Sequence, residues 1–297
     1  MARLEEPGAL VKAQTVVILK SEHKLEDLLE AASLARSTYF YHQSRLTQQD
    51  KHGALKQAIH QIFIGSKRRY GYRRILLQLR SQGWKVNHKL VYKLMDQMNL
   101  KSKVRPRKKY SSYQGQISYI AENLLNRNFT PNKPNIAWVS DVTEFRVCGT
   151  KVYLSPIMDL YDRTILSYEL SLSPNTTFTA KSLRDAMSWH GPAEGLIVHT
   201  DQGFQYQHSS WKKLIEGAGG VQSMSRKGNC YDNAVMENFF GHLKSEVYHG
   251  ESFASVEDFC QAVDDYIYWY NNGRLQERLK GLAPMGYRSQ ALAALTV

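Results

Sequence analysis

The N-terminal third of the chain repeats its apolar residues at the spacing of amphipathic helices. One helix is predicted over residues 54–63 and a second over 70–80, with Gly83 just beyond its end. Asn87 is a suitable N-cap for a third helix over 89–98, whose apolar residues recur every three or four positions. The last two helices and the glycine turn between them predict a helix-turn-helix.

Residues 25–43 predict an earlier and shorter pair of helices around a turn near Ser33. Such a pair occurs both in DNA-binding helix-turn-helix motifs and in purely structural bundles. The pattern alone leaves both interpretations open.

Beyond residue 136 the pattern changes to short apolar and β-branched runs typical of strands. Three strands in hairpin order are followed by alternating helices and strands. The strands are predicted over 137–147, 152–159, 164–170, 195–200 and 220–224, and the helices over 177–189, 209–216 and 232–248. Pro156 marks a bulge or an edge position. This order predicts an α/β, ribonuclease-H-like core, a mixed five-stranded sheet with helices, preceded by an all-α helix-turn-helix region.

These changes of pattern divide the chain into segments. An Asn/Pro-rich stretch before residue 136 supplies the boundary between the helical region and the sheet. The predicted segments are an N-terminal helical part (1–50), a basic helix-turn-helix region with an arm (51–110), a linker (111–135), the α/β core (136–250) and a C-terminal helical extension (251–297).

Composition excludes several classes of protein. No apolar run approaches the roughly 18–20 residues needed to cross a bilayer, so no membrane association and a cytoplasmic, nucleoid-associated location are expected. The three cysteines, Cys148, Cys230 and Cys260, form no Cys-x-x-Cys pair. Neither a disulfide framework nor a zinc site is indicated.

Positive charge is concentrated in one block, and this changes the interpretation of the helical region. Residues 51–110 hold 17 Lys and Arg against one acid, Asp96, in a chain of net charge +12. Such a block is expected of a module that binds a polyanion, although a solvated basic face on a small helical core is the alternative. The predicted DNA contacts are Arg73, Arg74, Lys89, Lys93, Arg105, Arg107, Lys108 and Lys109.

Three carboxylates stand in distinctive contexts within the predicted core. Asp141 and Asp201 each lie at or near the end of a predicted strand, and Glu237 lies in a predicted helix, with 35 residues between Asp201 and Glu237. Three such acids can converge on two Mg²⁺ or Mn²⁺ ions, an arrangement that cuts and joins phosphodiesters. Asp141 is assigned to bridge both ions. Lys244 returns to almost the azimuth of Glu237 two helical turns later and can hold a phosphate.

Other residues could compete for these roles. A single Asp at a strand end is more often a turn former, so the assignment depends on the three acids together. The rival carboxylates are Asp159, Asp162, Asp232 and Glu246, of which Asp232 suits a helix cap and Asp162 a turn. His199, His208 and His242 are expected to be structural or to contact DNA, because two-metal chemistry needs no histidine base.

Several motifs together resemble a known family. His199 to Tyr206 (HTDQGFQY), Asp232 to Glu246 (DNAVMENFFGHLKSE) and Tyr270 to Arg274 (YNNGR) are similar to the second-frame products of IS3-family insertion-sequence transposases, most of all the IS150 branch. The wider group has a retroviral-integrase-like catalytic core. The resemblance covers about residues 25–290, with one departure: Leu275-Gln276 replaces the commoner Pro-His after Arg274.

The resemblance implies a DDE-type polynucleotidyl transferase, a DNA transposase with Asp141, Asp201 and Glu237 as metal ligands and Lys244 as the basic partner. It also implies terminal inverted repeats and target DNA as substrates, a homo-oligomer in the synaptic complex, and the upstream-frame product of the same element as a possible partner. A non-enzymatic DNA-binding regulator and a ribonuclease acting on RNA–DNA hybrids are the alternatives.

Overall fold

The computed structural model describes residues 7–47, 50–103, 120–226 and 233–295. The chain divides into two compact units, residues 1–58 and 59–297. The arm residues Arg105, Arg107, Lys108 and Lys109, and the rival acid Asp232, lie outside the described residues. No helix in the described ranges is both long and apolar enough to cross a membrane.

The first unit contains three short helices, α1 (Ala9–Leu19), α2 (Leu25–Ala31) and α3 (Arg36–Thr47). The predicted helix pair is confirmed as α2 and α3, with Ser33 in the turn at a φ of 49°. Helix α1 was not predicted, because its apolar residues do not form one stripe. Val16 is buried, whereas Ile18 is 73% exposed.

The basic region forms α4 (Gly53–Gly65), α5 (Tyr72–Ser81) and α6 (His88–Gln97), as the periodicity predicts. The Asn87 side chain accepts a hydrogen bond from the Leu90 backbone N–H at 2.8 Å, so the predicted cap is confirmed. Apolar side chains from α5 and α6 are buried, among them Ile75, Leu79, Val91 and Leu94. The helices therefore bury their apolar faces, and Lys89 and Lys93 of α6 lie toward solvent.

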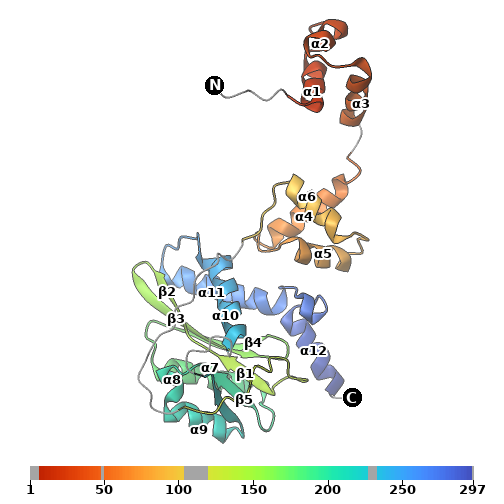
Figure 1. Ribbon diagram of the computed structural model, residues 1–297. Helices are drawn as coiled ribbons and strands as arrows, with labels where there is room; N and C mark the ends of the chain where they lie inside the picture. Colours follow the sequence, from red (N-terminus) through yellow and green to blue (C-terminus); the bar gives the residue numbers. More distant parts are fainter. Residues whose placement is uncertain (1–6, 48–49, 104–119, 227–232, 296–297) are drawn as a thin grey trace. The chain divides into compact units, whose positions relative to one another are not determined.

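A mixed sheet forms the centre of the second unit (Figure 1). Its strands are β1 (Ala137–Ser140), β2 (Thr143–Val147), β3 (Thr150–Asp159), β4 (Ile165–Ser171), β5 (Ile197–Thr200) and β6 (Val221–Met224). β3 pairs antiparallel with β1, β2 and β4, whereas β5 pairs parallel with β1 and β6. This is the predicted ribonuclease-H-like order.

The first predicted strand, 137–147, is interrupted, which corrects the count from five strands to six. β1 and β2 keep the same register against β3, since Ser140 faces Ile157 and Thr143 faces Leu154. If the pairing with β3 is continued through residues 141 and 142, between β1 and β2, Asp141 lies opposite Pro156. Proline has no backbone N–H to donate, which gives a physical reason for the break at this point. β3 is a central strand, so Pro156 is not at an edge.

Helices cover both faces of the sheet, as Figure 1 shows. One face packs against α7 (Thr176–His190), α8 (Phe204–Gln207) and α9 (Ser209–Gly217), through buried residues such as Trp138, Leu183 and Trp211. The other packs against α10 (Ala234–Leu243) and α11 (Val256–Asn272), through residues such as Val139, Phe240 and Phe259. The sheet is therefore buried on both sides, as expected where strands run parallel.

The helix predicted over 232–248 begins at Ala234 as α10 and continues as a π-helical turn, Lys244–Tyr248. Phe240, Leu243 and Val247 are buried, which confirms that they anchor this helix to the sheet. A short 3₁₀ turn, Glu277–Leu279, and α12 (Pro284–Leu295) complete the predicted C-terminal helical part.

Candidate active site

Asp141 and Asp201 directly follow two neighbouring parallel strands. β1 and β5 pair with Val139 opposite His199, so the same register sets Asp141 level with Asp201. Val139 belongs to the core on the α10 side of the sheet, and side chains two residues apart share a face. Both aspartates therefore follow strands at the same edge, on the side that α10 covers.

Backbone N–H groups fix one oxygen of each aspartate. The Val142 N–H donates to Asp141 Oδ1 at 2.7 Å, and the Gly203 N–H donates to Asp201 Oδ1 at 2.9 Å. A Cβ at Gly203 would lie only 3.0 Å from that Asp201 oxygen and 3.0 Å from Gln205 Oε1. A side chain at this position would crowd both oxygens, and glycine avoids that contact.

Charge connects the third acid to this pair. Burial, then the Asp201 carboxylate, and to a smaller extent Glu237 raise the pKa of Asp141 well above its ordinary value, whereas the Val142 N–H and Lys244 act in the opposite direction. Burial also raises the pKa of Asp201. The site gathers negative charge in a partly desolvated place, which a bound cation would stabilise.

The basic residue predicted to accompany Glu237 also lies at this site. Lys244 Nζ is 5.2 Å from the centre of the Phe145 ring, and its charge acts on Asp141. In the described part of the chain, no three acidic, histidine or cysteine side chains are arranged to hold one metal ion.

The rival carboxylates in the described residues have structural partners. The buried Arg288 guanidinium lies 2.8 Å from both Asp159 and Asp162, and Asp162 also accepts from the Thr164 N–H in a turn. Glu246 is buried in an ion pair with Arg274 at 2.6 Å. These acids hold the C-terminal helices and are not available to a metal.

The histidine expectations can be examined in the same way. His199 is fully buried, with Nδ1 2.8 Å from Ser223 Oγ and Nε2 3.0 Å from Ser225 Oγ. His208 caps α9 by accepting from the Ser210 N–H. Both positions agree with a structural role.

Tyr206 was not singled out from the sequence, although it ends the HTDQGFQY motif. Its hydroxyl lies 3.2 Å from Ser140 Oγ in the core beneath the aspartates. Burial and the charges of Asp141 and Asp201 raise the pKa of Tyr206 well above its usual value. The hydroxyl therefore stays neutral and packs beneath the acidic pair.

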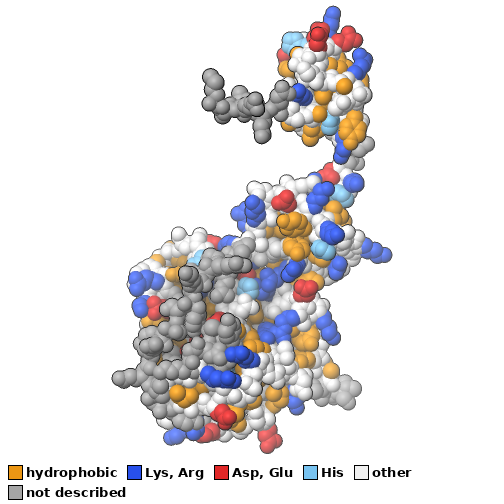
Figure 2. Space-filling view, in the orientation of Figure 1, with side chains coloured by type: hydrophobic (Ala, Val, Ile, Leu, Met, Phe, Trp, Pro, Cys, Tyr) orange, Lys and Arg blue, Asp and Glu red, His pale blue; other side chains and the backbone are white. Residues whose placement is uncertain are grey.

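The predicted DNA contacts differ in accessibility. Lys89 and Lys93 are exposed on α6, opposite the buried Val91 and Leu94, and Figure 2 shows Lys and Arg side chains over this middle region. Arg73 is exposed and donates to the Tyr72 hydroxyl at 3.2 Å. By contrast, the half-buried Arg74 donates to the Leu275 carbonyl oxygen at 3.1 Å.

Comparison with known proteins agrees with this arrangement. Residues 131–230 and 237–292 match models of the integrase core domain, and residues 50–109 match an HTH-like domain. Fold and site together define an integrase-type polynucleotidyl transferase behind a helix-turn-helix region.

Full-length relatives identify the family. The chain is 42% identical over 272 residues to the putative transposase InsK of insertion sequence IS150 from Escherichia coli K12, covering 92% of this chain and 96% of the relative. It is 30% identical over 279 residues to the transposase InsF of IS3A from the same organism, covering 92% and 97%. The chain belongs to this family of IS3- and IS150-type insertion-sequence transposases, and is thus a DNA transposase.

One further relative and one solved structure are also similar to this chain. An uncharacterized transposase-like protein of Haemophilus influenzae is 44% identical over 208 residues, covering 70% of this chain and 95% of that one. Among solved structures, the HTLV-2 integrase catalytic core domain in complex with magnesium matches with a TM-score of 0.43 and 15% identity, over 53% of this chain and 98% of that one.

Proposed function

We propose that this transposase cleaves DNA at the ends of its insertion sequence and joins the exposed 3′-hydroxyl to target DNA, using Asp141, Asp201 and Glu237 to hold two Mg²⁺ or Mn²⁺ ions. The observation that carries the proposal is the shared register of Asp141 and Asp201, with Glu237 acting on the same charge cluster.

The donor set fits these ions. Carboxylate oxygens are hard ligands, and Mg²⁺ usually keeps several waters and takes only one or two carboxylates. Asp141 would contribute to both ions, with Asp201 and Glu237 each completing one. When bound, the ions supply a positive charge to the attacking and leaving oxygens of an in-line displacement.

The protein's own groups position the substrate. Lys244 is close enough to the acids to lower the pKa of Asp141, so its ammonium can bind a phosphate oxygen beside them. The Gly203 N–H holds the Asp201 carboxylate, and the Tyr206 hydroxyl contacts Ser140, the residue before Asp141. Preorganisation of this kind reduces the rearrangement needed during reaction.

DNA binding would fall to the basic helices. Lys89 and Lys93 present charge from α6, and Arg73 from α5, toward solvent. We include the arm residues Arg105, Arg107, Lys108 and Lys109 in this surface on sequence grounds. The proposed assembly is a homo-oligomer on paired terminal repeats, acting in the nucleoid-containing cytoplasm and joined where required by the upstream-frame product.

A strand-transfer assay on pre-cleaved ends of the element that carries this gene tests the proposal. With Mg²⁺, the native protein should join ends to target duplex, and Glu237→Gln and Asp201→Asn should lose at least about 100-fold in rate. Glu194→Gln, an exposed acid outside the site, is the matched control. Retained transfer by Glu237→Gln would contradict the assignment. Preferential cleavage of RNA–DNA hybrid would instead support a ribonuclease.

A further inference from the structure

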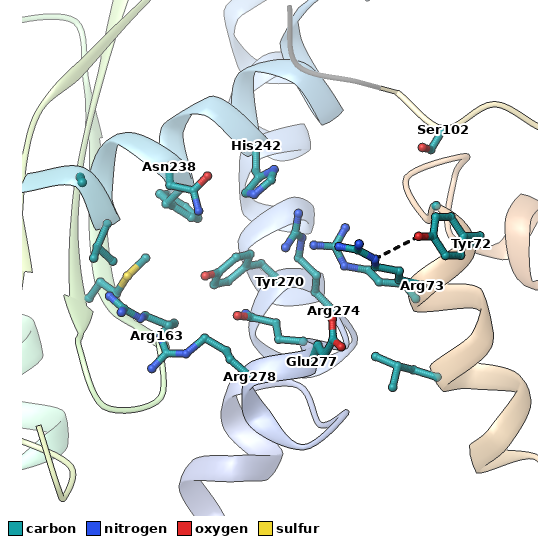
Figure 3. Close-up of a pocket in the computed structure, with 18 residues that line it drawn as sticks. Tyr72, Arg73, Ser102, Arg163, Asn238, His242, Tyr270, Arg274, Glu277 and Arg278 are labelled. Atoms are coloured by element: carbon teal, nitrogen blue, oxygen red, sulfur yellow. Dashed lines mark hydrogen bonds between the residues drawn. The ribbon is translucent and has the colours of Figure 1, made fainter. Parts of the chain in front are cut away.

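A cavity of about 740 Å³ lies between the start of α5, the face of α10 that carries Asn238 and His242, and the segment joining α11 to α12. Figure 3 shows Arg163 and Arg278 at one end in this view, and Arg73 and Arg274 at the other, with Tyr270 between them. None of the three proposed metal ligands lines it.

The lining is strongly cationic. Five arginines, Arg73, Arg74, Arg163, Arg274 and Arg278, meet a single carboxylate, Glu277. Within the described residues, Arg274 alone among the five forms an ion pair with an acid, and that acid is Glu246. Burial and the neighbouring Arg274 charge lower the pKa of Arg74, as expected where cations repel one another.

Hydrogen-bond donors in the cavity are left unsatisfied. Among the described lining residues, Arg163 Nη1 and Arg274 Nε are buried without an acceptor. Arg274 is only 2% exposed, so water does not readily compensate it. A buried donor without a partner is destabilising, so an acceptor that reached these lining residues would stabilise the protein.

The cavity lies on a different side of α10 from the catalytic acid. At about 100° per residue, Asn238 and His242 are turned roughly 100° and 140° from Glu237, whereas Lys244 falls within about 20° of it. A ligand in the cavity is therefore separate from the phosphodiester at the acidic site.

We propose that this arginine-lined cavity binds a phosphate of the DNA backbone other than the reacting one. This inference rests on the proposed function, because that function makes DNA the ligand. Guanidinium groups match phosphate oxygens with paired hydrogen bonds, and unpaired arginines at both ends suit a polyanion better than one small ion. Because Arg73 comes from the helix-turn-helix region and Arg278 from the C-terminal helical part, the bound DNA backbone would connect the two.

Binding measured in EDTA tests the cavity separately from catalysis. The probe is duplex DNA of the element end. The key variant is Arg278→Gln, because this exposed side chain forms no hydrogen bond within the described residues. We expect Arg278→Gln to bind this duplex at least about 5-fold more weakly than the native protein. The slope of log affinity against log salt should be shallower by about 0.9, the value for one phosphate contact. Arg184→Gln, an exposed cation on α7, is the matched control. Arg163→Gln provides a second cavity variant.

Phosphate-ethylation interference locates the contact. Ethylation of one or a few phosphates should weaken DNA binding by the native protein and by Arg184→Gln. The same ethylation should have no effect on DNA binding by Arg278→Gln. Equal loss at all positions would mean diffuse attraction and overturn the proposal. So would tight binding of inorganic pyrophosphate that Arg278→Gln abolishes while DNA binding is unchanged. Repeating these binding measurements with Glu237→Gln distinguishes failure of this proposal from failure of the proposed function. The cavity contact should persist in that variant even though strand transfer is lost.

Discussion

The Arg274 guanidinium lies 2.6 Å from a carboxylate oxygen of Glu246, and both side chains are at most 4% exposed. This ion pair connects the π-helical turn after α10 to the end of α11. The Tyr266 hydroxyl also donates to the same carboxylate at 3.1 Å. The helix that carries Glu237 is therefore fixed at its far end by a buried charge network.

Removing one member of this pair should strongly destabilise the fold. Glu246→Gln leaves the Arg274 charge buried without a counter-ion, and the expected loss in free energy of unfolding is about 3–5 kcal/mol. Urea denaturation measures it, with the exposed Glu257→Gln on α11 as control. A loss below about 1 kcal/mol would show that the pair is not a principal contact.

His190 should make the protein sensitive to mild acid. Burial, with a smaller contribution from Arg288, lowers the pKa of His190, whose Nε2 lies 3.1 Å from the Leu166 carbonyl oxygen. Its stability contribution is present above the unfolded-state pKa of about 6.5 and is lost as the pH falls through the lowered folded-state pKa. One such group contributes a slope of up to about 1.4 kcal/mol per pH unit.

Denaturation between pH 7 and 5 tests this expectation. His190→Gln should flatten the decline relative to the native protein, whereas His60→Gln, at an exposed position of α4, should not. Parallel curves for native protein and His190→Gln would contradict it.

Divalent cations should raise the melting temperature through the acidic site. At 100 times its dissociation constant, one bound ion adds about 2.7 kcal/mol to the stability. Asp141→Asn should lose most of the shift produced by Mn²⁺, while Glu144→Gln, exposed on β2, should keep it. An unchanged shift in Asp141→Asn would place the ion elsewhere.

Gly203→Ala should impair strand transfer more than DNA binding. The added Cβ would meet Asp201 Oδ1 and Gln205 Oε1 at 3.0 Å, so the carboxylate must move. A displacement of this kind costs on the order of 100-fold in rate. Gly217→Ala, where nothing lies within 4 Å, is the matched glycine control. Full activity in Gly203→Ala would show that Asp201 tolerates the shift.

The exposed lysines of α6 should contribute to DNA affinity by releasing counterions. Each phosphate contact changes the slope of log affinity against log salt by about 0.9, so Lys89→Gln with Lys93→Gln should reduce it by about 1.8. Fluorescence anisotropy with a labelled duplex measures the slope. The control Arg184→Gln with Lys213→Gln, at two other exposed positions, should leave this slope nearly unchanged.

Much of the fold follows from local pattern. The α5 and α6 helices have clear apolar stripes, and Asn87 marks where α6 begins. The strand order follows from runs that alternate with helices. Helix α1 escaped prediction because Leu10 and Val11 are exposed beside its buried Ala13 and Val16, so no periodic stripe marks it.

The site was predictable only in part, for physical reasons. Asp141 and Asp201 could be located at strand ends, but their shared register depends on pairing between strands 60 positions apart. The partners of Glu246 and Asp159 also come from distant segments, Arg274 and Arg288. Long-range ion pairs leave no periodic trace in the sequence, and neither does the arginine-lined cavity.

The position of Pro156 opposite Asp141 has a mechanical consequence. The ladder of hydrogen bonds is interrupted there without any slip of register, since β1 and β2 keep a common alignment against β3. Residue 141 therefore lies outside the ladder, between two segments that are both paired with β3. The Asp141 carboxylate is accordingly positioned by the paired segments before and after it and by the Val142 N–H.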